Sequence, residues 1–397
     1  MKRLLAGLIL LFSLSGPLGA ESAKVITLAD LDLRLAYSSV SNTGGSWSGN
    51  AWFFLMPAVK FDRSNYLLPV LSSSFSTSEK VIEEETLFAN RFNNLFSLGY
   101  KHKYGETMDL KISGDVRYNF NMQTKEELLG KGLYDLYDLG GTVSLSLYPS
   151  AEEKQYPVTF TAKYFTRTYP NYTSLAASGS SSTTVTLNKN VRPKDFAGTS
   201  LSAEWKGLIL GLTADASYDL VLKGYYDNLI LDTNGVITGP GRFDAVHFVD
   251  FGLMNYMSSS FTLGVECNFT NYVSNGNEFD SSLLVYQPNY YAYTSLSVRP
   301  NVFFLMGNFT VNVYYQYLVR NYASRTARSS SGAYIPAANE QDFETNIGVS
   351  LKLPLSKSVN WVSGMSFFTT SSNMAYEQFV KYNYQIFNIS SGVSINL

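Results

Sequence analysis

Polar and apolar residues alternate along several long stretches of this chain, and the clearest one is residues 107–120. Its even positions, from Met108 to Phe120, are apolar or Gly, whereas its odd positions, from Thr107 to Asn119, are all polar. Successive side chains of a strand point to opposite faces, so this pattern predicts a strand with one apolar and one charged face. The same period of two recurs in 208–219, 260–270, 308–321 and 342–353.

Turn residues organise these strands into hairpins. Short connections are predicted near residues 105, 153, 207, 258, 306 and 356, about fifty residues apart, and they alternate with long polar segments such as 169–195, 223–243 and 322–341. Each repeat holds two long strands, one tight turn and one long loop. This favours an up-and-down meander over a β-propeller, because a blade of four strands needs a turn about every ten residues. Further strands near 31–39, 51–61, 66–77 and 93–104 bring the total to about sixteen, within a range of 14 to 18.

These features predict an all-β protein, namely a transmembrane up-and-down antiparallel β-barrel over residues 31–397. Its short turns would be periplasmic, its long loops extracellular, and both chain ends would lie on the short-turn side. In lipid every backbone N–H and C=O group needs a partner, and a closed barrel leaves no open edge. A large soluble β-sandwich is the alternative. The long alternating runs and the unequal loop lengths favour the barrel.

The first twenty residues have the layout of an export signal. Lys2 and Arg3 precede an apolar run over 4–14, and Ala20 closes a small-residue cleavage site. We therefore expect a signal peptide over 1–20 and a short periplasmic segment over 21–30. The alternative is an uncleaved anchor helix, but the apolar run is about half of the ~20 residues that a spanning helix needs.

Composition excludes several classes of protein. Charged residues are 16% and aromatic residues 15% of the 397 residues, with 29 Tyr and 26 Phe, so the chain is not disordered. A net charge of −2 argues against a nucleic-acid partner. One cysteine, Cys267, and two histidines leave no basis for a disulfide framework or a His/Cys metal site. We expect no cofactor.

In this layout the sequence resembles the bacterial outer-membrane β-barrels, and most nearly the sixteen-stranded porins. The resemblance covers the whole barrel region and rests on layout rather than on a motif. It implies a bacterial outer-membrane location, outer-membrane lipid around the barrel and passive diffusion of small hydrophilic solutes through it. It also implies a homo-oligomer, in particular a trimer. Such barrels often end in Phe, whereas this chain ends in Leu397.

If the apolar residues face lipid, their polar neighbours along each strand face the lumen. A barrel of sixteen strands is wide enough to leave an aqueous channel, and its wall would carry charges of both signs. The alternative for each single residue is a cross-strand ion pair that only stabilises the wall. The strand residues predicted to line the pore are Lys111, Asp115, Arg117, Asp215, Asp219, Glu266, Arg320 and Glu344.

The loop over 121–139 contains several leucines beside its charges. By resemblance to porins, the loop after the fifth strand folds inward and narrows the pore; the alternative is an apolar cap over the barrel rim. An inward loop would carry its charges toward the wall that bears Lys111, Asp115 and Arg117. Most of these loop charges are acidic, so the narrowest point would favour cations. The loop residues predicted to line the pore are Glu126, Glu127, Lys131, Asp135 and Asp138.

Two other functions stay open beside a porin-like channel. The barrel could serve an envelope export or assembly machine, for example in polysaccharide export, and stay closed until a partner engages it. A surface hydrolase is the third hypothesis, but His102 is expected to face outward without a serine on the same face, and we expect no enzyme. Tyrosines in the loops could stack on sugar rings or belong to the interfacial girdle. They are Tyr169, Tyr172, Tyr286, Tyr290, Tyr291 and Tyr293.

Overall fold

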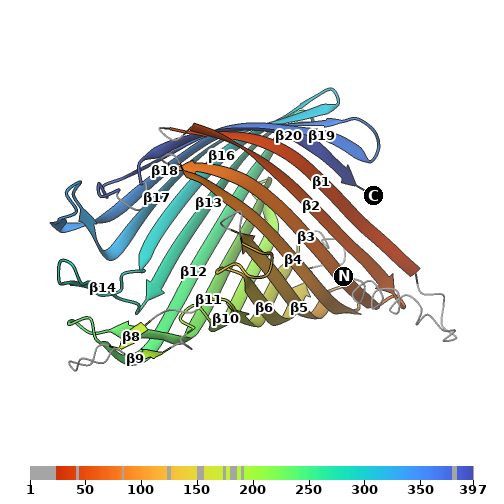
Figure 1. Ribbon diagram of the computed structural model, residues 1–397. Helices are drawn as coiled ribbons and strands as arrows, with labels where there is room; N and C mark the ends of the chain where they lie inside the picture. Colours follow the sequence, from red (N-terminus) through yellow and green to blue (C-terminus); the bar gives the residue numbers. More distant parts are fainter. Residues whose placement is uncertain are drawn as a thin grey trace.

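The computed structural model describes residues 24–41, 44–82, 85–122, 127–149, 156–172, 176–178, 186–188, 192–377 and 382–396. These residues form a closed barrel of sixteen antiparallel strands in chain order (Figure 1). The predicted all-β up-and-down barrel is thereby confirmed. In the described ranges no helix is long and apolar enough to cross a membrane. The predicted signal peptide, residues 1–20, lies outside them.

The barrel strands vary in length, and two small hairpins lie outside the barrel sheet. The barrel consists of β1 (Lys24–Val40), β2 (Gly44–Lys60), β3 (Asn65–Ile82), β4 (Glu85–Tyr104), β5 (Met108–Met122), β6 (Leu136–Leu147), β7 (Val158–Thr168), β10 (Phe196–Ile209), β11 (Leu212–Leu231), β12 (Ile237–Ser258), β13 (Phe261–Ser274), β16 (Tyr293–Met306), β17 (Phe309–Arg328), β18 (Tyr334–Pro354), β19 (Val359–Ser372) and β20 (Tyr384–Asn396). The small hairpins are β8 (Ala176–Ser178) with β9 (Thr186–Asn188), and β14 (Glu278–Asp280) with β15 (Val285–Gln287).

The first and last strands close the barrel. β1 pairs with β20 from Asp30 to Val40, which leaves no gap between the first and last strands along this stretch. Both described chain ends lie at the short-turn end of the barrel. Lys24 pairs with Lys60 just before the turn at 61–64, and the Asn396 amide donates a hydrogen bond to the carbonyl oxygen of Ser358 in the turn at 355–358. The small hairpins lie at the opposite end, to the left in Figure 1.

One short turn shows how local sequence supports the meander. Leu210 and Gly211 join β10 to β11 with φ values of 52° and 83°. Two successive left-handed residues are what a type I′ turn requires, and this turn matches the twist of the paired strands. Leu210 adopts this left-handed conformation at a local steric cost, and its side chain is 97% exposed.

Strand ends differ from the prediction. β1 begins at Lys24, inside the segment 21–30 that we expected to lie outside the barrel, because residues 24–29 pair with β2 alone. Much of the predicted long loops 223–243 and 322–341 is also strand. Register shifts after Gly224 and after Asn321 let the paired strands continue beyond the regular ladder. These hairpins therefore extend the barrel wall.

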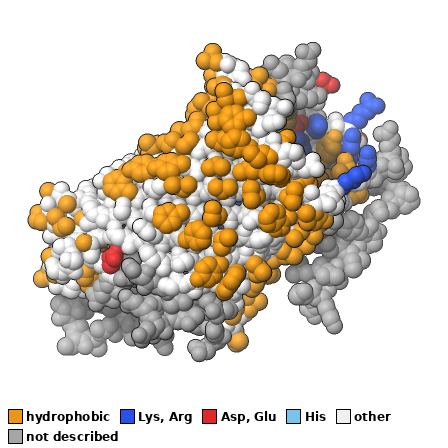
Figure 2. Space-filling view, turned by 90° about the horizontal axis from the view of Figure 1, so that it is seen from above, with side chains coloured by type: hydrophobic (Ala, Val, Ile, Leu, Met, Phe, Trp, Pro, Cys, Tyr) orange, Lys and Arg blue, Asp and Glu red, His pale blue; other side chains and the backbone are white. Residues whose placement is uncertain are grey.

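Directly paired residues share one face of the sheet, so the register separates the two faces of the barrel. One face carries exposed aliphatic side chains, for example Leu35 at 67%, Leu296 at 51% and Ile347 at 48%. Figure 2 shows hydrophobic and uncharged side chains spread over this outer surface, and the few charged ones in view lie toward its ends. The opposite face, which lines the interior, holds the charged residues of the strands.

Candidate functional site

The interior face of the barrel carries the polar residues that alternation predicted. In β5, Lys111, Asp115 and Arg117 share this face, whereas Ile112 points outward and is 50% exposed. Pairing carries the same assignment from strand to strand, for example from Asp115 to Ser97 in β4. The predicted residues that the register places on the interior face are Lys111, Asp115, Arg117, Asp138, Asp215, Asp219, Glu266, Arg320 and Glu344.

A basic arc lies on β4, β5 and β7 and consists of Lys101, Lys103, Lys111, Arg117, Lys163 and Arg167. Acidic residues between these cations neutralise part of the charge. Lys101 Nζ lies 2.6 Å from Asp109, and Lys163 Nζ lies 3.0 Å from Asp115. The second pair crosses β6 above Gly140, where a Cβ atom would come within 3.1 Å of Asp115 Oδ1 and of Lys163 Cε. Gly140 thus leaves the space in which this pair forms.

Asp138 is the most strongly bound carboxylate of the basic arc. It accepts hydrogen bonds from Arg167 Nε at 2.7 Å and Nη2 at 2.8 Å, and Arg117 Nη1 lies 3.9 Å away. The sequence predicted Asp138 as a loop charge that approaches Arg117. The structure brings the two together, but it places Asp138 within β6, directly opposite Arg117 in the ladder.

An acidic arc lies on the neighbouring strands β10–β13 and consists of Glu204, Asp215, Asp219, Asp250 and Glu266. Glu266 lies 3.5 Å from Arg299 Nη1 and accepts a hydrogen bond from Asn301 Nδ2 at 3.1 Å. Asp215 lies on this face opposite Lys206 and remains exposed. The two arcs together give the interior wall sectors of opposite sign.

Two interior charges were missed because the alternation in 244–256 fits either face. Pairing with β11 settles the direction, since Asp250 lies opposite Ser217 and Asp244 lies opposite Lys223. Asp244 is fully buried and accepts hydrogen bonds from Tyr225 and Ser274 beside its ion pair with Arg242 at 3.0 Å. The alternation in β11 assigns its two faces unambiguously, so pairing the next strand with β11 would have placed Asp244 and Asp250 on the interior face.

The extracellular part of the wall contains a further ion-pair group. Arg320 lies 3.5 Å from Asp342 and 3.4 Å from Glu344, and its guanidinium lies over the ring of Tyr293 at 5.4 Å. Tyr293 also stacks on Tyr272 at 5.3 Å. Of the tyrosines considered for sugar stacking, Tyr293 is thus part of the interior wall.

The described part of the loop over 121–139 packs on the extracellular rim. Asp135 is 1% exposed and accepts hydrogen bonds from the Asn121 amide at 2.7 Å and the Gly132 amide at 3.1 Å. The side chain of Asn171 donates to the carbonyl oxygens of residues 130 and 132, which ties the loop to the next extracellular connection. Burial raises the pKa of Asp135. Its carboxylate therefore organises the loop and does not face the pore as we predicted.

The other predicted loop residues follow this placement. Lys131 is exposed at the rim, and Glu127 is half-buried there. Glu126 lies outside the described residues. Lys194 lies over the rings of Tyr134 at 4.3 Å and Tyr172 at 4.6 Å, and burial lowers its pKa. These contacts favour the rim cap over the inward loop.

Exposure distinguishes an open interior from a packed one. The side chain of Glu266 is 48% exposed and that of Arg117 is 41% exposed, although both point into the barrel. A packed interior would bury them, because charged side chains are almost never left inside a core without complete pairing. The interior wall therefore borders water-accessible space.

Both histidines lie on the outer face. His102 Nδ1 is 2.7 Å from Asn65 Oδ1, and His247 Nδ1 is 2.9 Å from the Tyr218 hydroxyl. In the described ranges, no group of three or more His, Cys, Asp or Glu residues is arranged to hold a metal ion.

No protein-family model and no curated protein matches the chain. Several solved barrels are similar in overall architecture. OccD3 (OpdP) of Pseudomonas aeruginosa is 8% identical with a TM-score of 0.47, over 94% of this chain and 91% of that chain. OmpT of Vibrio cholerae, a trimer form, is 10% identical with a TM-score of 0.46, over 95% and 100%. CdiB of Acinetobacter baumannii is 11% identical with a TM-score of 0.47, over 92% and 60%. Likeness at this level bears on neither solute nor partner.

The architecture itself sets the location. An even number of antiparallel strands, an apolar outer face and closure without an edge are the features of barrels in the bacterial outer membrane. The protein is a bacterial outer-membrane β-barrel.

Proposed function

We propose that this barrel is a porin-like channel through which small hydrophilic solutes diffuse passively across the outer membrane. The observation that carries the proposal is the exposure of interior charged side chains, above all Glu266 at 48% and Arg117 at 41%. Side chains that remain hydrated inside a closed barrel border an aqueous path. A sixteen-stranded barrel has the width for such a path.

The wall chemistry supports a channel with weak rather than strict charge selection. Ion pairs such as Lys163–Asp115 neutralise part of each arc, while the described residues provide no ion-pair partner for Lys111 or Asp215. Solutes of either sign would therefore meet attractive and repulsive sectors. The field between the arcs orients polar solutes, and its strength falls as ionic strength rises.

One sector of the wall is nearly uncharged. Ser72 and Ser74 of β3 share the interior face with Trp52 and Phe54 of β2, whose rings stack at 5.8 Å. Trp52 Nε1 donates to the Ser72 hydroxyl at 3.2 Å, so the indole is fixed against the wall. This sector offers hydroxyl groups and aromatic edges to neutral solutes. It supports a general path for hydrophilic molecules rather than one restricted to ions.

Reconstitution into a planar bilayer tests the proposal. Purified full-length protein should give steady conductance steps at low voltage in potassium chloride, and heat-unfolded protein should give none. A correctly folded barrel that stays silent would contradict the channel and favour the closed export conduit.

We propose a homo-oligomer, specifically the trimer that the resemblance implies. Light scattering of the detergent-solubilised protein at three times the protomer mass would support that assembly, and a monomer mass would contradict it.

A further inference from the structure

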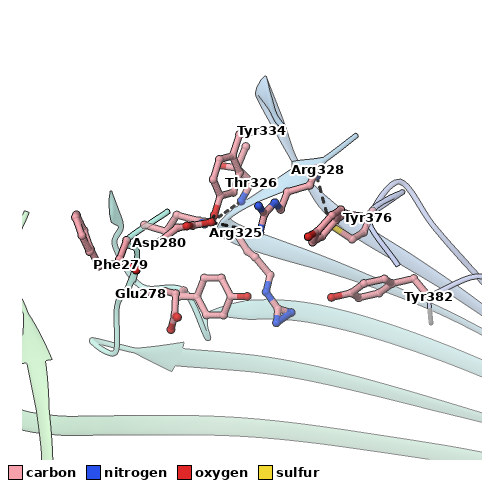
Figure 3. A pocket seen from close by; sticks show the side chains of 13 residues that line it. Glu278, Phe279, Asp280, Arg325, Thr326, Arg328, Tyr334, Tyr376 and Tyr382 are labelled. Carbon is pink, nitrogen blue, oxygen red and sulfur yellow. Dashed lines mark hydrogen bonds and ion pairs between the residues drawn. The ribbon is translucent and has the colours of Figure 1, made fainter. Parts of the chain in front are cut away.

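A second feature lies at the extracellular end of the barrel, above the charged wall. A cavity of about 350 Å³ opens between the β14–β15 hairpin, the upper end of β17 and the connection from β19 to β20. Its volume is at the lower end of the ~300–1,000 Å³ of small-molecule sites. Figure 3 shows side chains from all three segments directed into it. The residues that carry the argument are Glu278, Asp280, Tyr290, Arg325, Arg328 and Tyr382.

Arg325 is fixed at the floor of the cavity by two aromatic rings. Its guanidinium lies 4.4 Å from the ring centre of Tyr290 and 4.3 Å from that of Tyr322. Its Nη1 atom donates to Glu340, at 3.3 Å, and Glu340 is only 1% exposed. In Figure 3 the guanidinium lies between Glu278 and Tyr382. Arg325 thus presents donors to the cavity from a position that stacking and an ion pair hold in place.

Arg328 is held in the same way at the opposite wall. Its guanidinium lies 4.7 Å from the ring centre of Tyr334 and 4.6 Å from that of Tyr376. Its Nη1 atom lies 3.3 Å from Asp280, and Nε donates to the carbonyl oxygen of Gly332 at 2.7 Å. The Tyr334 hydroxyl also donates to Asp280, at 3.1 Å. Such a network is preorganised, so a ligand would not have to order it on binding.

The balance of charge argues against an anionic ligand. Arg325 is paired with the buried Glu340 and Arg328 with Asp280, both at 3.3 Å, and Glu278 is a further carboxyl group in the cavity lining. Each arginine is already paired with an acid, so a further carboxylate or phosphate would gain little attraction and would meet Glu278. A neutral ligand that can both donate and accept hydrogen bonds suits this set of groups.

We propose that this cavity binds a neutral saccharide at the mouth of the barrel. A sugar hydroxyl donates to a carboxylate such as Glu278 and accepts from Arg325, and neighbouring hydroxyls match adjacent acceptors and donors. The ring of Tyr382 offers an apolar surface to the C–H face of a pyranose. Burial raises the pKa of Tyr382, so its phenol stays protonated and available as a donor. The volume accommodates about one or two sugar rings.

Part of this site changes an earlier interpretation. Tyr382, which was not among the tyrosines considered for sugar stacking, lines the cavity. Among the loop tyrosines considered for sugar stacking, Tyr290 lines it as well, while Tyr291 lies 3.8 Å from the Arg242 guanidinium and Tyr286 accepts from Asn277. The saccharide site therefore consists of residues distant in sequence.

Saturation-transfer NMR on the full-length barrel in a detergent without a sugar headgroup tests the site. The probes are glucose and maltose, with glucuronate as the anionic counterpart. We expect transfer to at least one neutral sugar and weaker transfer to glucuronate. Tyr382→Ala and Arg325→Gln should each weaken binding about tenfold, the factor that loss of one charged hydrogen bond or ring contact corresponds to.

Tyr164→Ala is the matched control, because Tyr164 is 57% exposed on the outer face of β7, opposite in direction to the interior residue Lys163. It should leave sugar binding unchanged. No transfer to either neutral sugar, stronger transfer to glucuronate, or equal binding in all variants would overturn the proposal. Conductance is measured separately on the same preparations. A conducting barrel without sugar binding would refute this site alone, and sugar binding by a silent barrel would refute the channel alone.

Discussion

Asp138 offers the sharpest perturbation of the channel wall. It is 6% exposed, binds Arg167 through two hydrogen bonds of 2.7 and 2.8 Å, and lies 3.9 Å from Arg117. Lys223 lies over the same Phe196 ring as Arg167, so a third cation is close to this group. Among the described residues, Asp138 is the acid that forms ion pairs with both Arg117 and Arg167, and Asp138→Asn removes its charge.

Two magnitudes follow from this geometry. A hydrogen bond to a charged group contributes ~1.5–3 kcal/mol; because Asn still accepts one bond, we expect the free energy of unfolding to fall by ~1.5–2 kcal/mol. At ~10 Å from the channel axis and a dielectric constant of ~80, one unit charge changes the energy of a monovalent ion by ~0.4 kcal/mol. The cation preference should then fall about fourfold at low salt, where screening is weak.

Urea unfolding and the reversal potential in a tenfold potassium chloride gradient measure the two effects. Glu106→Gln is the matched control, because it removes the same charge from the short turn at 105–107 rather than from the interior wall. Its reversal potential should equal that of the unmodified protein. An unchanged unfolding midpoint in Asp138→Asn would contradict the stabilising pair with Arg167. An unchanged reversal potential would contradict the hydrated interior.

Two further substitutions test the barrel closure and the loop. The methyl group that Gly392→Ala adds would overlap the carbonyl oxygen of Leu33 across the β1–β20 pair. We therefore expect the free energy of unfolding to fall by ~1–3 kcal/mol and the refolding yield in a gel-shift assay to decrease. Gly114→Ala is the control, because its nearest neighbour would lie at 3.9 Å, and it should refold normally. Asp135→Ala should speed proteolysis within residues 127–135 without changing ion selectivity, because Asp135 binds loop amides at the rim. Lys131→Gln is the control at an exposed position and should leave the cleavage rate unchanged. A change of ion selectivity in Asp135→Ala would instead support the loop that folds into the pore.

Side-chain direction could be predicted from the sequence because a period of two allows only two assignments once one face is apolar. Lys111, Asp215 and Glu344 lie on the predicted face for this reason. Strand ends could not be predicted as well. Polar residues continue the strands beyond the membrane, and nothing in their pattern marks the bulge after Asn321.

The ion-pair and hydrogen-bond partners of the wall residues could not be predicted from the sequence either. Lys163 reaches Asp115 across an intervening strand because Gly140 leaves space between them, and this depends on two registers at once, β5 with β6 and β6 with β7. The position of Asp135 depends on backbone amides that only the folded loop brings together. The cavity at the mouth joins β14, β17 and Tyr382, which lie far apart in the chain.

The central claim is that the charged face of the sheet lines a water-filled channel. Cysteine accessibility tests it most directly in a Cys267→Ala background, since Cys267 is the only native cysteine. Glu266→Cys places a thiol on the interior face and Val265→Cys places one on the outer face. A charged methanethiosulfonate added to the open barrel in a bilayer should reduce the current of Glu266→Cys in steps and leave Val265→Cys unchanged. An unreactive Glu266→Cys, or current block through Val265→Cys, would contradict the account.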